Sequence, residues 1–176
     1  MKGIVLAGGK GTRLYPCTLV VNKHLLPIYD QPMIYYPIKT LVQAGCEEIL
    51  IVTGGENPGE FMRLLKNGKQ FGIDSILYAY QENSVGGIAD ALKLAKSFVG
   101  KEKFCVVLGD NIIFDNLYPH FQSFKTEPIG TAKVFIKEIN NPQAFGVAEI
   151  NNDKITNIID KPTHPTTNYA VVGVYL

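Results

Sequence analysis

The sequence predicts an α/β protein in which a mainly parallel sheet lies between two layers of helices. Strand-like and helix-like segments alternate along the first two-thirds of the 176 residues. The strand-like segments are short apolar runs, as expected for buried strands. Glycines or polar residues follow the ends of several of these runs. An alternation of this kind argues for parallel strands joined by helical crossovers.

Strands are expected where the short apolar runs occur, at 3–7, 48–53, 76–80, 104–108 and 131–136. The first predicted helix follows Asp30 and Pro32, which are a reasonable cap and first-turn pair. Its apolar residues repeat at helical spacing until Gly45, a natural stop. The other helices are expected at 59–66, 87–98 and 117–124.

The last third of the chain changes character and predicts antiparallel structure. Segments 145–150 and 154–159 flank Asn151-Asn152-Asp153, which is typical of a hairpin turn. A further strand is expected at 169–176. The complete prediction is a Rossmann-like three-layer α/β/α fold with a mainly parallel mixed sheet and a C-terminal β-hairpin, in one domain over residues 1–176.

Composition excludes several classes of protein. Apolar residues make up 46% and charged residues 19% of the chain, which argues against disorder. Seventeen basic and sixteen acidic side chains leave a net charge of +1, so we expect no nucleic-acid or membrane partner. Three separated cysteines fit neither a zinc motif nor a disulfide framework. Without a signal peptide in the segment MKGIVLAGG, the expected location is the cytoplasm.

A glycine-rich loop follows the first predicted strand, with the sequence L-A-G-G-K-G-T-R-L at 6–14. In an open α/β sheet, ligands bind beyond the carboxyl ends of the strands. Glycines let backbone N–H groups approach phosphate oxygens closely, and the Arg13 guanidinium matches phosphate in shape and charge. The loop therefore predicts a phosphate site, with a tight turn that holds no ligand as the alternative.

Two familiar glycine motifs do not fit this loop. The dinucleotide fingerprint requires a third glycine where this chain has Leu14. The P-loop requires Gly-Lys-Ser/Thr, but Lys10 is followed by glycine. Assignment of the chain as an NAD-type dehydrogenase would thus depend on analogy of fold alone.

Two polar residues follow other predicted strands. Asp110 comes directly after 104–108, where a carboxylate can hold Mg2+ against a triphosphate. The alternative interpretation is that Asp110 and the asparagine after it only form a turn. Gln81 follows 76–80, and its amide offers a donor and an acceptor that can read the imide edge of thymine or uracil.

Several motifs, taken together, resemble the sugar-1-phosphate nucleotidyltransferases. G-G-x-G-T-R-L-x-P occurs at 8–16 and N-K-x-L-L-P-I at 22–28. The continuation Y-D-Q-P-M-I-Y-Y-P-I at 29–38 is similar to the glucose-1-phosphate thymidylyltransferases in particular. The match continues in order with L-G-D-N at 108–111, F-G-V at 145–147, D-K-P at 160–162 and N-Y-A-V-V-G at 168–173. The resemblance therefore covers the whole chain.

The resemblance implies a nucleotidyltransferase fold and an Mg2+-dependent transfer of a thymidylyl group from dTTP to glucose-1-phosphate. The products would be dTDP-glucose and pyrophosphate, by in-line attack of the sugar phosphate on the α-phosphorus. About four negative charges remain on the two substrates after one Mg2+ is counted, so fixed cations must offset their repulsion. A homo-oligomer is also implied.

The resemblance assigns roles to particular residues of this chain. Arg13, Lys23 and Asp110 are the expected catalytic residues, and Asp110 is the expected Mg2+ ligand. Nucleotide binding is expected at Leu6, Gly8, Gly9, Gly11, Thr12, Arg13, Gln81, Gly86, Gly87 and Asp110. Sugar-phosphate binding is expected at Lys23, Gly146, Asp160, Lys161 and Val172.

This chain departs from the family pattern at three places. One extra residue after Gln81 leaves both Gly86 and Gly87 as candidates. Asp160 replaces the usual glutamate, which makes glucose less certain than the reaction type. The second metal carboxylate of the family comes later than residue 176, so we expect a domain truncated at its C-terminal end.

Two alternatives to thymidylyl transfer stay open. Uridylyl transfer is the nearest, because thymine and uracil differ by one methyl group. The other is a nucleotide-sugar-binding module without turnover, which the missing second carboxylate motivates. The three histidines indicate no catalytic constellation, and the resemblance requires no histidine at position 24.

Overall fold

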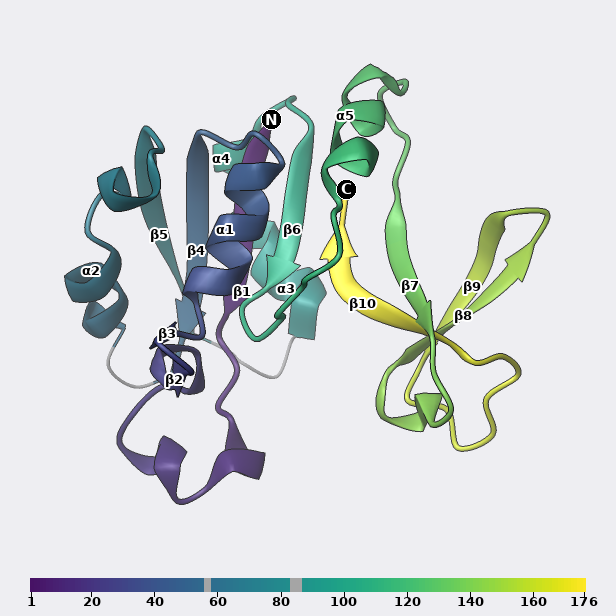
Figure 1. The fold of residues 1–176 in the computed structure, drawn as a ribbon, viewed down its shortest axis with the longest axis horizontal. Coiled ribbons are helices and arrows are strands. Elements are labelled where there is room, and N and C mark those ends of the chain that lie inside the picture. The colour runs from purple at the N-terminus through teal and green to yellow at the C-terminus, as the bar shows by residue number, and fades with distance from the viewer. Residues whose placement is uncertain (56–57, 83–86) are drawn as a thin grey trace. The chain divides into compact units, whose positions relative to one another are not determined.

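The computed structural model describes residues 1–55, 58–82 and 87–176 (Figure 1). The chain divides into two compact units. Unit 1 comprises residues 1–131 together with Leu176, and unit 2 comprises residues 132–175. Among the described residues, no helix is long and apolar enough to cross a membrane.

Unit 1 contains a sheet of parallel strands, as the sequence predicts. Its strands are β1 (Lys2–Ala7), β4 (Glu48–Gly54), β5 (Ser75–Gln81) and β6 (Phe104–Leu108), in the order β5-β4-β1-β6. Every strand pair within this sheet is parallel. In β1, Ile4 and Val5 are completely buried. Burial on both faces explains why β1 is apolar without alternation.

Helices cover both faces of this sheet, so the predicted three-layer arrangement is confirmed. The helices of unit 1 are α1 (Tyr35–Gln43), α2 (Gly59–Leu65), α3 (Gly87–Leu94), α4 (Lys96–Val99) and α5 (Tyr118–Thr126). Figure 1 shows α1 in front of the sheet and α3 and α4 behind it. Helix α1 packs closely at Gly3, where an added Cβ would lie 3.1 Å from Leu41 Cδ1.

The predicted helix start at Asp30 and Pro32 is wrong. Strands β2 (Pro27–Ile28) and β3 (Gln31–Pro32) form a small antiparallel hairpin instead, and α1 begins at Tyr35. Tyr29 adopts a φ of 59° in the turn between them. Just after the hairpin, the N–H of Ile34 donates to the carbonyl of His24, so the chain before the hairpin is tied to the start of α1. A two-residue strand pair of this kind has no periodic signal in the sequence.

Two other segments differ from expectation. The connection from β1 to β2 contains three short 3-10 helices, at Thr12–Leu14, Cys17–Leu19 and Lys23–Leu25. The single helix predicted at 87–98 is interrupted between α3 and α4. Buried Ala95 donates its N–H to the Leu92 carbonyl three residues back, which tightens the turn and ends the α-helical pattern.

Unit 2 consists of antiparallel strands. Strand β10 (Tyr169–Tyr175) pairs with β7 (Val134–Glu138) and β8 (Gly146–Asn151), and β8 pairs with β9 (Lys154–Asp160). The predicted hairpin is therefore confirmed as β8–β9. Asn152 and Asp153 form its turn with φ values of 48° and 59°. Asn and Asp tolerate this left-handed conformation, which is why the turn was recognisable in the sequence.

Candidate functional site

The parallel register of unit 1 brings separate loops to one edge of the sheet. Ala7 lies opposite Thr53, and Leu6 lies opposite Leu108. Gly54 pairs in register with Gln81. The segments that follow β1, β5 and β6 therefore start beside one another, which is where open α/β sheets hold their ligands.

A cavity of about 210 Å³ lies at this edge. It is lined by seven residues that the sequence assigned to the site: Leu6, Gly8, Gly9, Lys23, Gln81, Gly87 and Asp110. Four further residues also line it: His24, Ile88, Ala91 and Leu108. The predicted nucleotide site is thus brought together in large part within unit 1. Gly86 lies outside the described residues.

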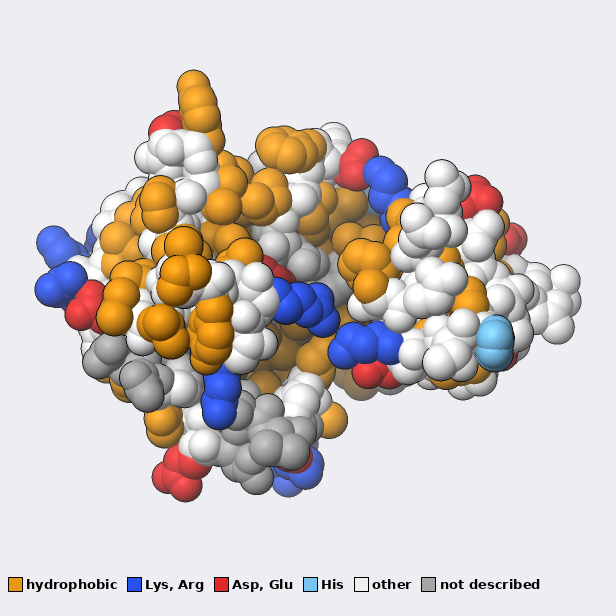
Figure 2. All heavy atoms as spheres, turned by 90° about the horizontal axis from the view of Figure 1, so that it is seen from below, with side chains coloured by type: hydrophobic (Ala, Val, Ile, Leu, Met, Phe, Trp, Pro, Cys, Tyr) orange, Lys and Arg blue, Asp and Glu red, His pale blue; other side chains and the backbone are white. Residues whose placement is uncertain are grey.

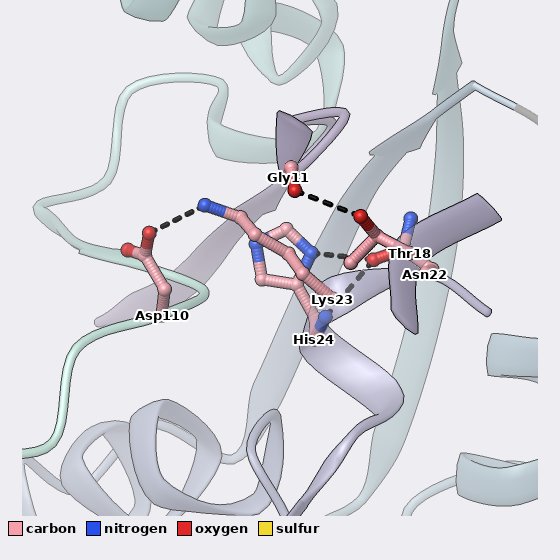
Figure 3. A network of polar contacts seen from close by, with 6 residues as sticks. All are labelled: Gly11, Thr18, Asn22, Lys23, His24 and Asp110. Carbon is pink, nitrogen blue, oxygen red and sulfur yellow. Dashed lines mark hydrogen bonds and ion pairs between the residues drawn. The ribbon is translucent and has the colours of Figure 1, made fainter. Parts of the chain in front are cut away.

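Lys23 and Asp110 form an ion pair in this cavity, with 2.5 Å between Nζ and Oδ2 (Figure 3). They are 87 residues apart in the sequence. Burial raises the pKa of the Asp110 carboxyl, but the hydrogen bond and the charge of Lys23 outweigh burial and lower the pKa. The cavity therefore presents an ionised carboxylate beside a held ammonium group.

The glycine loop wraps around the Lys23 side chain. A Cβ on Gly11 would lie 2.9 Å from Lys23 Cβ, and a Cβ on Gly9 would lie 3.3 Å from Lys23 Cε. Gly11 also has a φ of +65°, which favours glycine. The Thr18 hydroxyl donates to the Gly11 carbonyl at 2.8 Å and holds the loop in place. Two glycines are therefore needed to let the lysine pass toward Asp110.

Gln81 occupies the other wall of the cavity and is only 8% exposed. Its Nε2 donates to the Gly87 carbonyl at 3.4 Å. A Cβ on Gly8 would lie 2.8 Å from Gln81 Oε1. The absence of a side chain at Gly8 therefore leaves room for the amide of Gln81, which lines the cavity at the end of β5.

Thr12 and Arg13 do not line this cavity. They belong to the 3-10 helix Thr12–Leu14 and are exposed. Gly9 and Lys10 line a neighbouring cavity of about 260 Å³ together with Gly54 and Gly55. Gly9 thus lines both cavities, and Arg13 lines neither of them.

Hydrophobic side chains gather on the face of unit 1 that Figure 2 shows. The loop after Arg13 supplies exposed Leu14, Tyr15, Leu19, Val20 and Val21. Val20 and Val21 also line a cavity of about 550 Å³ beside α2. An exposed apolar loop beside a phosphate-type loop is a feature that the sequence alone did not indicate.

The sequence did not identify Asn22 and His24 as parts of the site. His24 is 2% exposed, and Asn22 Oδ1 accepts hydrogen bonds from its backbone N–H at 3.0 Å and from Nδ1 at 2.7 Å. Burial lowers the pKa of His24 to about 3, with a further lowering by the charge of Lys23 and an opposing effect of Asp110. The available signal was Asn22 itself, since asparagine is a preferred N-cap residue.

In unit 2, three of the predicted sugar-phosphate residues lie together. Gly146 pairs in register with Asp160, and the Lys161 N–H donates to the Phe145 carbonyl at 2.9 Å. Lys161 Nζ lies 3.8 Å from Asp160 Oδ2. Val172 is half-buried on β10. The end of the β8–β9 hairpin therefore offers a carboxylate and an ammonium group next to a glycine.

The side chains that line the cavity supply only part of the ligands that a cation such as Mg2+ needs. Within the ranges that the structure describes, no three His, Cys, Asp or Glu side chains cluster as a metal site. Asp110 is the carboxylate that lines the cavity at the strand ends. Magnesium prefers one or two carboxylates completed by phosphate oxygens and water. Asp110 therefore fits as one ligand of a metal that arrives with a phosphate group.

The fold and the place of the glycine loop are those of α/β proteins that hold ligands at the carboxyl ends of parallel strands. Within that class, the family model described as nucleotidyl transferase matches residues 2–176. The chain belongs to this family, and the resemblance read from its motifs is confirmed.

Named relatives make the comparison more specific. The chain is 46% identical over 176 residues to a glucose-1-phosphate thymidylyltransferase of Neisseria meningitidis, covering 99% of this chain and 60% of the relative. It is 45% identical to the enzyme of that name from Xanthomonas campestris, covering 99% and 59%. A solved structure named for a glucose-1-phosphate thymidylyltransferase from Bacillus anthracis superimposes with a TM-score of 0.93 at 46% identity, covering 99% of this chain and 70% of that one. The chain thus spans about 60% of the length of these curated relatives.

The buried His24 predicts how stability depends on pH. Its pKa of about 3 lies below the value of 6.5 expected in the unfolded chain, so protonation favours unfolding. The resulting stabilisation is fully present above pH 6.5 and is lost as the pH falls toward 3. Between about pH 7 and pH 5, His24 alone should lower the free energy of unfolding by about 2 kcal/mol.

Urea unfolding at the two pH values measures this effect. His24→Asn should lose the His24 contribution, whereas His120→Asn, on an exposed position of α5, should keep it. Parallel pH curves for the wild-type chain and His24→Asn would contradict the low pKa.

Proposed function

We propose that the protein transfers a thymidylyl group from dTTP to glucose-1-phosphate, giving dTDP-glucose and pyrophosphate. The observation that carries this proposal is the single cavity in which a glycine loop, the Lys23–Asp110 pair and Gln81 meet. Relatives at 45–46% identity bear the name of this activity. The activity of the whole protein is proposed on these two grounds together.

The base is read by Gln81 in this proposal. Its amide carries one donor and one acceptor, which match the imide edge of a pyrimidine such as thymine. Gly8 and Gly87 flank the amide closely, so a planar base can approach the backbone there. Leu6 supplies apolar surface in the same cavity. Gly86 remains a further candidate of the same loop.

The phosphates of the nucleotide are held by cations and backbone N–H groups. Gly9, Gly11 and Thr12 offer the backbone of the loop. Arg13 is exposed, and its planar guanidinium group would bind the β- and γ-phosphates. Lys23 exchanges the Asp110 carboxylate for phosphate oxygen, and so stabilises the charge that develops in the in-line displacement.

Asp110 would hold magnesium beside the triphosphate. When bound, this ion neutralises phosphate charge and polarises the α-phosphorus toward attack. The pKa of Asp110 is lowered, so its carboxylate is ionised at neutral pH, as a metal ligand must be. No covalent intermediate is needed, since the sugar phosphate is itself the nucleophile.

Residues of unit 2 would bind the sugar phosphate in this proposal. Lys161 would offset the charge of the phosphate, and Asp160 would accept hydrogen bonds from sugar hydroxyls. Gly146 and Val172 would shape the surface under the ring. Asp160 is 80% exposed, so its carboxylate is available to a ligand.

The wider context follows from the same proposal. We place the enzyme in the cytoplasm as a homo-oligomer, with its two substrates as small-molecule partners and without nucleic acid or membrane. A net charge of +1 supports the absence of bulk attraction to polyanions.

A second candidate is uridylyl transfer, because the imide edge that Gln81 reads is common to thymine and uracil. A panel of dTTP, UTP, dCTP, ATP and GTP with glucose-1-phosphate, followed by pyrophosphate release, separates the candidates. We expect dTTP to be preferred over UTP by about 10-fold or more, since one methyl group in an apolar pocket is worth about that factor and the two nucleotides differ at the ribose 2′ position as well. A preference for UTP would overturn the thymidylyl assignment, and binding of dTTP without turnover would favour a binding module.

Substitution of the two charged residues tests their catalytic role. Arg13→Ala and Asp110→Asn should each lower kcat about 100-fold or more, because each removes charge stabilisation of the transition state. The melting temperature should change little. Arg63→Ala and Asp90→Asn are matched controls: Arg63 is an exposed arginine, and Asp90 is as exposed as Asp110 and is also paired with a lysine. A variant that mainly unfolds the chain would assign that residue a structural role.

A further inference from the structure

His24 occupies a central place in the cavity wall although the family resemblance requires no histidine there. The residue directly follows Lys23 in the 3-10 helix Lys23–Leu25. Its imidazole is 2% exposed and lines the same cavity as Lys23 and Asp110. Burial of a polar ring close to two charged side chains costs free energy unless its polar atoms are hydrogen-bonded.

Asn22 fixes one side of the ring. Its Oδ1 accepts the backbone N–H of His24 at 3.0 Å and lies 2.7 Å from Nδ1 (Figure 3). Because this oxygen is an acceptor, Nδ1 must carry a hydrogen and donate it. The bond therefore fixes both the tautomer and the orientation of the ring, and leaves Nε2 as the unprotonated nitrogen.

Gly109 receives the opposite side of the ring. A Cβ on Gly109 would lie 2.7 Å from His24 Cδ2, 3.0 Å from His24 Nε2 and 2.9 Å from the Leu6 carbonyl oxygen. The Gly109 N–H donates to that same carbonyl at 2.8 Å. The imidazole therefore rests against the backbone immediately before Asp110, in space that only glycine leaves open.

These contacts make His24 a spacer between two parts of the chain. Asn22 and the backbone of Lys23 lie on one side of the ring, and the segment from Gly109 to Asp110 lies on the other. Lys23 and Asp110 extend from the two segments on either side of this spacer and form the ion pair with 2.5 Å between Nζ and Oδ2. Phe61 of α2 lies near the ring, tilted by 47° with 6.4 Å between the ring centroids.

We propose that His24 is a positioning residue, which holds the chain segments that carry Lys23 and Asp110 in their relative places through its bond to Asn22 and its contact with Gly109. This inference rests on the proposed nucleotidyl transfer, in which Lys23 and Asp110 act on the phosphates. Reactions between closely held groups are sensitive to placement, and an error of about 1 Å can cost about 100-fold in rate.

Two substitutions of His24 each remove one of its two contacts. His24→Phe keeps the ring but removes the Nδ1 donor, so Asn22 loses its bond to the side chain. His24→Asn keeps an N–H near the place of Nδ1 but loses ring volume. His120→Phe on the exposed face of α5 is the control for the substitution itself.

Steady-state kinetics of the full chain with dTTP and glucose-1-phosphate provide the first test. We expect His24→Phe to lower kcat by about 10- to 100-fold with KM for dTTP changed by less than about 3-fold. His24→Asn should also lower kcat, because without the ring its side chain cannot reach Gly109, and His120→Phe should match the wild-type chain. Wild-type kcat in either His24 variant, or a change confined to KM, would overturn the proposal.

Crystal structures of the two His24 variants provide a readout that does not depend on turnover. The Lys23–Asp110 ion pair should open by about 1 Å or more in each variant, since each removes one of the two contacts of the ring. An unchanged pair in both variants would overturn the inference even if the wild-type chain is active. An inactive wild-type chain with the expected geometry in both variants would instead reject the proposed function and leave the positioning role supported.

Discussion

The parallel pairing of β1 with β4 on one side and β6 on the other is the constraint on which the candidate site depends. Its register places Ala7 opposite Thr53 and Leu6 opposite Leu108. The glycine loop and Asp110 therefore begin at the same edge of the sheet, although about 100 residues separate them. Close packing of Leu41 and Ile49 against Gly3 favours this register, because a shift would bring a larger side chain of β1 into that space.

Close approach, rather than a large number of polar groups, then builds the cavity. Lys23 passes Gly9 and Gly11 to reach Asp110, and Gln81 lies against Gly8. Gly109 lies against the ring of His24 in the same way. Each of these glycines leaves room for a specific side chain from another segment, so the loop acts as a frame around Lys23 as well as a phosphate-type turn.

The sequence was sufficient for the features that local patterns encode. Strand β6 was placed at its observed bounds from its apolar run, and the Asn152-Asp153 turn was recognised from residues that tolerate positive φ. The sequence did not indicate the hairpin at Pro27–Pro32, which is too short for a periodic pattern, or the burial of His24, which depends on its contact with the distant Gly109. Most residues of the cavity were predicted from the motifs and from the rule that ligands bind beyond the carboxyl ends of parallel strands. The motifs and this rule could not show that Lys23 is held by Asp110.

We propose that Lys23 and Asp110 are energetically coupled in nucleotidyl transfer, and a double-mutant cycle measures this coupling. Lys23→Met, Asp110→Asn and the double variant would be compared by kcat/KM for dTTP with glucose-1-phosphate. We expect the double variant to lose less than the sum of the single losses, with an interaction energy of about 1 kcal/mol or more. Losses that add to within about 0.5 kcal/mol would contradict it.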